Sequence, residues 1–178
     1  MPELDTARTR GLALDVDALL DTLAAKLSDY AKRHRIERWN PVGIHTGGVW
    51  VADQLCRRMG LDAALGRLDI SFYRDDFSQI GMHPQVKPSE LPEDIDGAHV
   101  LLIDDVLYTG RTIRAALNEI FDYGRPASVT LAVLVDRDGR ELPIQAAAAG
   151  TVIRLEVGEQ IKLRGPEPLK LEIVRTDR

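Results

Sequence analysis

Two adjacent carboxylates are the residues of this sequence whose type and position most strongly indicate chemistry. Asp104 and Asp105 directly follow the apolar run 100–103, which has the composition of a buried strand. Paired carboxylates at the end of a strand can accept hydrogen bonds from the vicinal hydroxyls of a sugar, or can hold the hydration shell of Mg²⁺. We expect both side chains to be exposed loop groups that contribute little to stability.

A Thr-Gly-x-Thr sequence at 109–112 follows these carboxylates. Gly110 allows a tight turn, Thr109 and Thr112 add hydroxyl donors, and the first N–H groups of a following helix have no partner within that helix. Together these groups predict an anion nest at the positive end of a helix dipole, suited to a phosphate monoester. Either motif alone is more often an ordinary turn, but their order in one loop after a buried strand favours a binding site.

The sequence His-Thr-Gly-Gly at 45–48 is a second candidate anion loop, because it stands between a predicted strand and a predicted helix. A glycine-rich turn without a ligand is an alternative interpretation of nearly equal weight. His45, His83 and His99 lack the spacing of metal ligands, and there is no nucleophile motif of the G-x-S-x-G type. Covalent catalysis is therefore not indicated.

The elements that must position these groups alternate between strands and helices. Apolar residues at helical spacing predict three helices, the first capped by Asp15 and the others ended by Gly60 and Gly124. An alternating pattern at 68–72 predicts a strand at the sheet edge. Continuous apolar runs predict buried strands at 41–44, 100–103 and 129–135. Such strands, joined by helices, are typical of a parallel sheet covered on both faces, so the predicted fold class is α/β.

Two segments depart from this alternation. Residues 74–97 show no helical or strand period and contain three prolines, which predicts a functional arm or lid. Residues 145–178 predict a C-terminal β extension, with a hairpin around 158–159 and a final strand near 169–173. We expect the whole chain, residues 1–178, to form one domain.

The composition is that of an ordinary globular protein. The 178 residues are 44% hydrophobic and 29% charged, and a chain of this length buries roughly 70% of its unfolded surface. The net charge of −5 gives no general attraction for nucleic acid or anionic lipid, so a polyanion site must be a local group of donors. The single cysteine, Cys56, cannot form an internal disulfide, and no apolar stretch reaches the length of a membrane span. We therefore expect a cytoplasmic protein that binds no membrane.

The segment 100–112, VLLIDDVLYTGRT, resembles the motif with which type I phosphoribosyltransferases bind 5-phosphoribosyl diphosphate (PRPP). With the segments 73–76, 123–137 and 140–144, it makes most of the chain similar to the PyrR family, pyrimidine-operon regulators with uracil phosphoribosyltransferase activity. The resemblance implies a type I phosphoribosyltransferase fold and the conversion of uracil and PRPP to UMP and pyrophosphate. It also implies Mg²⁺ held through PRPP and water without a direct protein ligand, a homodimer or higher homo-oligomer, and an mRNA leader as partner.

The resemblance further assigns roles to residues. It places the ribose hydroxyls on Asp104 and Asp105, and the 5′-phosphate in the loop of Val106, Leu107, Tyr108, Thr109, Gly110, Arg111 and Thr112. It places pyrophosphate against His45, Thr46, Gly47 and Gly48. Asp136 and Arg137 fall in the base region, where a salt-bridged strand end is an equally weighted alternative.

The chain departs from related patterns at two positions. Many relatives carry Thr-Arg-Gly in the pyrophosphate loop, whereas this chain has Gly47, so we take Arg74 as the catalytic residue that supplies the missing positive charge. Transferases for 6-oxopurines place an acid just before Thr-Gly, where this chain has Tyr108. A phenol is protonated near neutral pH and is a poor base, so a pyrimidine substrate is favoured.

Two other functions remain open at the level of sequence: a nucleotide-sensing RNA-binding regulator with little catalysis, and a transferase for another base. RNA binding requires a basic surface, but the first helix carries Asp15, Asp17 and Asp21 against Lys26. The basic cluster at 32–38 is more often a solvated face that complements a helix dipole. We therefore expect catalysis to be kept and RNA hairpin binding to be weak or lost at physiological salt.

Overall fold

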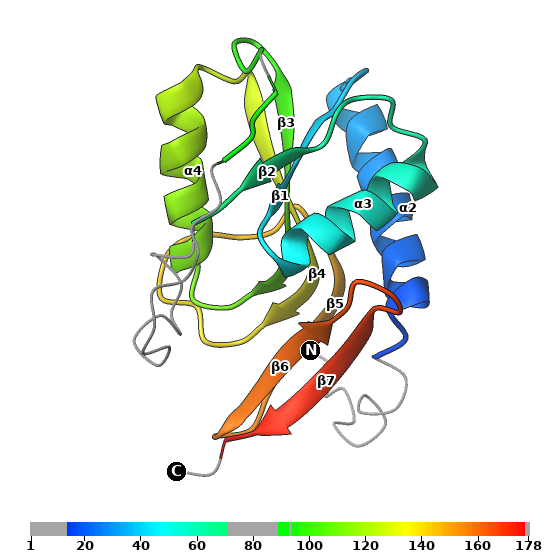
Figure 1. The fold of residues 1–178 in the computed structure, drawn as a ribbon, viewed down its shortest axis with the longest axis vertical. Coiled ribbons are helices and arrows are strands. Elements are labelled where there is room, and N and C mark those ends of the chain that lie inside the picture. Colours follow the sequence, from blue (N-terminus) through cyan, green and yellow to red (C-terminus); the bar gives the residue numbers. More distant parts are fainter. Residues whose placement is uncertain (1–13, 71–88, 93, 177–178) are drawn as a thin grey trace.

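A five-stranded parallel sheet forms the centre of the computed structural model, which describes residues 14–70, 89–92 and 94–176 (Figure 1). The spatial order of the strands is β2 (Gly66–Leu68), β1 (Asn40–Ile44), β3 (His99–Leu107), β4 (Ser128–Arg137) and β5 (Ala148–Ile153). One face of the sheet is covered by α2 (Val16–His34) and α3 (Gly47–Met59), and the other by α4 (Arg111–Tyr123). The predicted α/β class is confirmed.

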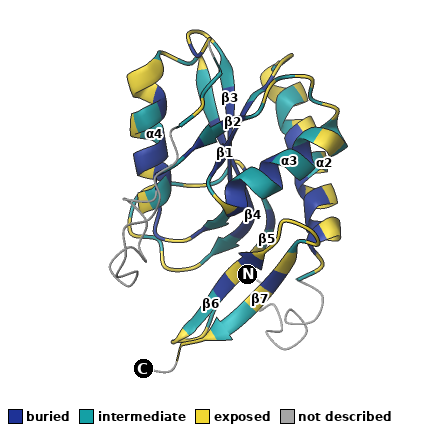
Figure 2. Ribbon diagram, in the orientation of Figure 1, coloured by how far each residue is buried: buried dark blue, intermediate teal, exposed yellow. Residues whose placement is uncertain are grey.

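The central strand β3 explains why the predicted strands are continuously apolar. Leu101 and Ile103 belong to the buried cluster beneath α2 and α3, whereas Val100 and Leu102 belong to the cluster beneath α4. Successive side chains of a strand point to opposite faces, so a strand covered on both sides needs an apolar residue at every position. Figure 2 shows this burial along the middle of the sheet.

The helix boundaries follow the predicted signals. The carboxylate of Asp15 accepts a hydrogen bond from the N–H of Ala18 (3.2 Å), which caps α2. Gly60 takes a left-handed conformation (φ 61°) directly after α3. Gly124 directly follows α4. These three helix ends are confirmed.

The edge strand β2 is shorter than predicted and is covered on its outer side. Leu68 pairs in parallel register with Ile44 of β1, and Phe72 lies outside the described residues. Arg67 and Glu90 exchange two backbone hydrogen bonds of 2.7 and 2.8 Å, so Glu90, within the predicted arm, lies along this edge of the sheet. Of that arm, residues 74–88 and 93 lie outside the described residues.

The predicted hairpin around 158–159 is wrong. Residues 148–153 form β5, which pairs in parallel with β4 in the main sheet. The antiparallel pair is instead β6 (Glu159–Arg164) with β7 (Lys170–Arg175), so the final strand is confirmed. Alternation of apolar residues indicates a strand but does not identify its partner. Ala148 and Ile153 bury their side chains in the same cluster as α2, which keeps β5 in the main sheet.

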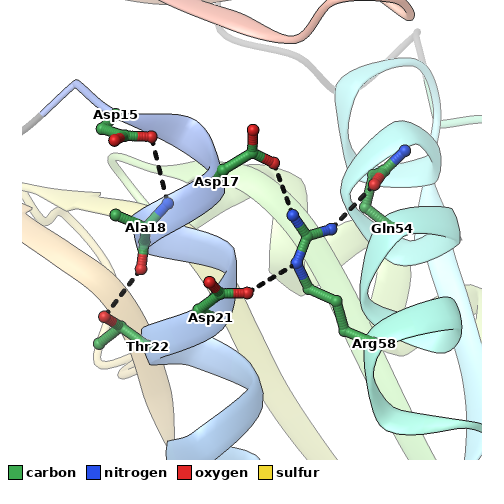
Figure 3. Close-up of polar contacts among 7 residues, drawn as sticks. All are labelled: Asp15, Asp17, Ala18, Asp21, Thr22, Gln54 and Arg58. Atoms are coloured by element: carbon green, nitrogen blue, oxygen red, sulfur yellow. Dashed lines mark hydrogen bonds and ion pairs between the residues drawn. The ribbon is translucent and has the colours of Figure 1, made fainter.

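One arginine joins the two helices that share a face of the sheet (Figure 3). Arg58 of α3 donates to the carboxylates of Asp17 (2.6 Å) and Asp21 (3.0 Å) of α2, and to the side-chain oxygen of Gln54 (2.8 Å). Two acids of the first helix therefore have a structural role. The third, Asp15, is the helix cap.

We expect Arg58→Ala to lower the free energy of unfolding by about 1 kcal/mol, because it removes two shared ion pairs between helices. Arg57→Ala is the matched control, since Arg57 pairs with Asp53 within α3 (2.7 Å), and pairs of this kind contribute only about 0.3–0.5 kcal/mol. Urea unfolding of both variants measures the difference. Equal losses would show that the contacts of Arg58 do not hold α2 against α3.

Candidate active site

The candidate site lies at the edge of the sheet where the parallel strands end and two helices begin. Strand β1 ends at Ile44 and is followed by α3 from Gly47, and β3 ends at Leu107 and is followed by α4 from Arg111. Ligands of open α/β sheets bind at this edge, because the loops there lie next to helix N-termini.

The two predicted carboxylates lie within β3, not in an exposed loop. Asp104 is only 2% exposed, and its Oδ1 accepts a hydrogen bond from the N–H of Asp105 (2.9 Å). The Oδ1 of Asp105, which is half-buried, accepts from the N–H of Val106 (2.9 Å). The expectation that both acids are exposed loop residues is therefore wrong, because both belong to β3 and neither is fully exposed. The reason is that β3 continues past its apolar run and pairs with β4 as far as Leu107.

Two glycines bring the first loop onto these acids. A Cβ built on Gly47 would lie 2.6 Å from the Cγ of Asp105, and a Cβ on Gly48 would lie 2.7 Å from the carbonyl oxygen of Ile103. Real Cβ atoms do not approach other atoms this closely, so a larger residue at position 47 requires the side chain of Asp105 to move, and one at position 48 requires the backbone of β3 to move. The N-terminus of α3 thus faces the carboxylate of Asp105, an arrangement that the helix dipole favours.

The other two residues of this loop make backbone contacts. The N–H of His45 donates to the carbonyl of Leu68 (2.8 Å), which ties the loop to the end of β2. The carbonyl of Thr46 accepts from the N–H of Trp50 (3.4 Å) in the first turn of α3. Arg74, the predicted source of positive charge, lies outside the described residues.

The second loop forms a small cavity at the start of α4. Gly110 precedes the helix with φ 94°, and the buried Thr109 accepts a hydrogen bond from the N–H of Arg111 through its Oγ1 (3.2 Å). The cavity has a volume of about 30 Å³, and its walls are Val106, Leu107, Tyr108, Thr109, Gly110, Thr112 and Ile113. All the residues predicted for this loop line it except Arg111, whose guanidinium pairs with Glu141 (2.7 Å).

The predicted base region lies beside this cavity. The guanidinium of Arg137 lies over the ring of Tyr108, 3.9 Å from its centroid. A Cβ built on Gly139 would lie 3.2 Å from the Cδ2 of the same ring, so the turn after β4 also contacts it. Asp136 pairs with Arg140 at 2.5 Å and not with Arg137. Asp136 therefore has an ion-pair partner, as in the alternative interpretation, and any role in binding a base stays a prediction.

Arg140 and Glu141 were not among the predicted site residues, although they lie at this site. Both contact the second loop, Arg140 through the carbonyl of Tyr108 and Glu141 through Arg111. Their place in the sequence could have indicated this role. Both come just after the predicted strand that became β4, and the ends of parallel strands β3 and β4 lie at the same edge of the sheet.

The titrating and metal-binding groups of the described residues add little to this site. Burial, together with the nearby Asp53, raises the pKa of the Cys56 thiol to about 11, so this residue of α3 is protonated at neutral pH. Within the described residues, no three His, Cys, Asp or Glu side chains form a metal-binding group. Carboxylate oxygens such as those of Asp104 and Asp105 are nevertheless suitable partners for a hydrated Mg²⁺ ion.

Comparison with known proteins identifies the class to which this fold and site belong. The sequence profile described as "phosphoribosyl transferase domain" matches residues 15–160, so the chain belongs to the phosphoribosyltransferase family. Within it, the chain belongs with the bifunctional PyrR proteins. It is 54% identical to the bifunctional protein PyrR of Nitrosococcus oceani, over 93% of this chain and 95% of the relative. It is 58% identical to that of Pseudomonas aeruginosa, over 86% of this chain and 91% of the relative.

Solved structures show the same fold at lower sequence identity. A hypoxanthine-guanine phosphoribosyltransferase from Bacillus anthracis has a TM-score of 0.63 at 18% identity, over 79% of this chain and 82% of that chain. A hypoxanthine phosphoribosyltransferase from Trypanosoma cruzi has a TM-score of 0.63 at 21% identity, over 79% of this chain and 80% of that chain. Among the described helices, none combines the length and apolar character needed to cross a bilayer.

We expect Gly47→Ala to destabilise the protein by about 1–3 kcal/mol, because the added Cβ collides with Asp105. Helix propensity alone predicts the opposite, a gain of up to about 1 kcal/mol for glycine to alanine in a helix. The free energy of unfolding of Gly47→Ala, measured by chemical denaturation, shows whether the steric loss or the propensity gain is larger. In an Asp105→Ala background the penalty should shrink, since the carboxyl group that lies closest to the added Cβ is gone, and an unchanged penalty would rule out this contact as its cause.

Proposed function

We propose that this protein transfers the 5-phosphoribosyl group of PRPP to uracil, which yields UMP and pyrophosphate. The observation that carries the proposal is the contact of the loop 45–48 with Asp105 at the end of β3, next to the cavity of the loop 106–112. PRPP requires three neighbouring subsites, for its pyrophosphate, its ribose and its 5′-phosphate. The first loop, the two acids and the second loop offer them in that order.

The mechanism follows from the charges that develop during displacement at the anomeric carbon. The ribose becomes oxocarbenium-like, so carboxylates near its hydroxyls fix its position and favour its positive charge. Asp104 is fixed by burial and Asp105 by the N-terminus of α3. The N–H groups at the start of α3 can donate hydrogen bonds to the departing pyrophosphate, with Arg74 as the proposed additional cation. Mg²⁺, bound through PRPP and water, would neutralise pyrophosphate charge.

Tyr108 supports a pyrimidine as acceptor. It stands where purine transferases place an acid before Thr-Gly, and it has no carboxylate that could act as a general base on a purine ring. Its ring lies beneath the guanidinium of Arg137 and close to the backbone of Gly139, and these contacts restrict its position at the wall of the phosphate cavity. We further propose that the enzyme is cytoplasmic and forms a homodimer or a higher homo-oligomer.

Regulation through RNA is the second candidate function, which the word "bifunctional" in the names of the relatives favours. In this chain Asp15 caps α2, and Asp17 and Asp21 contact Arg58, so the first turns of this helix present acids and no basic face. The exposed cations at 32–35 lie at the C-terminal end of α2, where they complement the helix dipole. We therefore propose that catalysis is kept and that binding of an mRNA leader is weak.

We expect pyrophosphate release from PRPP with uracil and not with guanine or hypoxanthine. Asp105→Asn should slow the uracil reaction roughly 100-fold, because it removes the charge that faces the ribose, with little loss of stability at this half-buried position. Pyrophosphate release across the panel of bases measures both effects. Asp122→Asn, an exposed acid of α4, is the control and should react like the unaltered protein.

Faster turnover with guanine would overturn the assignment to a pyrimidine. Unchanged turnover in Asp105→Asn would overturn the role of the acid pair.

We expect only weak binding of a labelled pyrimidine-operon leader hairpin at physiological salt, because the start of α2 is acidic and its cluster of cations lies in the last turn. Titration of this RNA with and without UMP, at several salt concentrations, tests the expectation. Tight and steeply salt-dependent binding that UMP strengthens would show that another basic surface of the protein serves as the RNA site.

A further inference from the structure

We propose that the segment 140–144, which follows β4, positions the 5′-phosphate loop. Arg140, its first residue, is the side chain most important for this role. The inference rests on the proposed function, because it concerns the loop that would hold the 5′-phosphate of PRPP. No role was predicted for this segment beyond its resemblance to the family.

Backbone carbonyls of the loop are held by this one segment. The N–H groups of Glu141 and Leu142 both donate to the carbonyl of Thr109, at 3.0 and 3.1 Å. The guanidinium of Arg140 donates to the carbonyl of Tyr108. The two carbonyls that precede the glycine turn are therefore both engaged by partners outside the loop.

This engagement matters because a carbonyl oxygen repels a phosphate, whereas an N–H group attracts it. With the carbonyls of Tyr108 and Thr109 drawn toward 140–142, the N–H groups at the start of α4 can face an anion. The segment also packs against the turn itself, because Cβ atoms of Leu142 and Ile144 lie 3.4 Å from where a Cβ on Gly110 would be. The segment thus fixes both the orientation and the position of the loop.

Arg140 connects the loop to the base region as well. Its Nη2 pairs with the Oδ1 of Asp136 at 2.5 Å, and the two side chains are only 26% and 20% exposed. Ion pairs that are largely shielded from water keep a fixed geometry and leave an uncompensated charge when one partner is removed. Arg140 therefore holds the end of β3 and the end of β4 in one arrangement.

Ligand affinities of Arg140→Ala test the proposal, measured by calorimetry with ribose 5-phosphate and, separately, with pyrophosphate. Loss of the charge-assisted hydrogen bond to the loop should weaken ribose 5-phosphate binding roughly tenfold. Pyrophosphate binding should change less than about twofold, because its proposed loop at 45–48 makes no contact with Arg140 that the structure describes. A general loss of protein stability would instead lower the affinity for both ligands to the same extent.

Two further variants complete the experiment. Arg140→Lys keeps the charge opposite Asp136 and should recover part of the ribose 5-phosphate affinity; it also serves if Arg140→Ala does not fold. Arg164→Ala is the matched control, since Arg164 pairs with Glu172 in the β6–β7 hairpin (3.0 Å) and should bind both ligands normally.

The outcomes separate this proposal from the proposed function. Unchanged ribose 5-phosphate affinity in Arg140→Ala, or an equal loss for both ligands, would overturn the positioning role. Failure of uracil turnover in an unaltered protein that still binds ribose 5-phosphate would overturn only the choice of acceptor base. An unaltered protein that does not bind ribose 5-phosphate would overturn the phosphate site and the positioning role together.

Discussion

The contact between the start of α3 and the acidic end of β3 is the constraint on which the site depends. It exists because residues 47 and 48 have no side chain, so that a helix N-terminus reaches a carboxylate and a strand carbonyl directly. The contact places opposite partial charges side by side at the sheet edge. A preorganised field of this kind requires no rearrangement when charge develops on a substrate.

The parallel sheet is what makes such a contact possible. All five strands run the same way, so the ends of β1 and β3 meet at one edge and the helices that follow begin there. The apolar residues of β3 anchor it on both faces, and the same strand then carries Asp104 into the buried layer. The position of the acids is therefore set by the hydrophobic core. A buried carboxylate is costly unless it is hydrogen-bonded, and Asp104 accepts from the next backbone N–H.

Structural features that depend on neighbouring residues of the chain could be predicted from the sequence. Features that depend on contacts between distant residues could not. Helix caps, apolar periods and the Thr-Gly-x-Thr turn depend on neighbours along the chain, so Asp15, Gly60 and the loop at 109–112 could be identified. The partner of a strand depends on distant residues, which is why the hairpin around 158–159 was wrong. The burial of Asp104 depends on the pairing of β3 with β4 beyond the apolar run. The contacts of Arg140 arise only when the ends of those two strands are brought together.

The pairing along the outer side of β2 has a consequence for how this protein meets other chains. Arg67 and Glu90 exchange two backbone hydrogen bonds, and the N–H of Asp69 donates to the hydroxyl of Ser89 (3.2 Å). An edge strand with unpaired N–H and C=O groups is a template on which a strand of another chain can pair. Because the outer backbone groups of Arg67 are already used, this edge of the sheet should resist edge-to-edge aggregation.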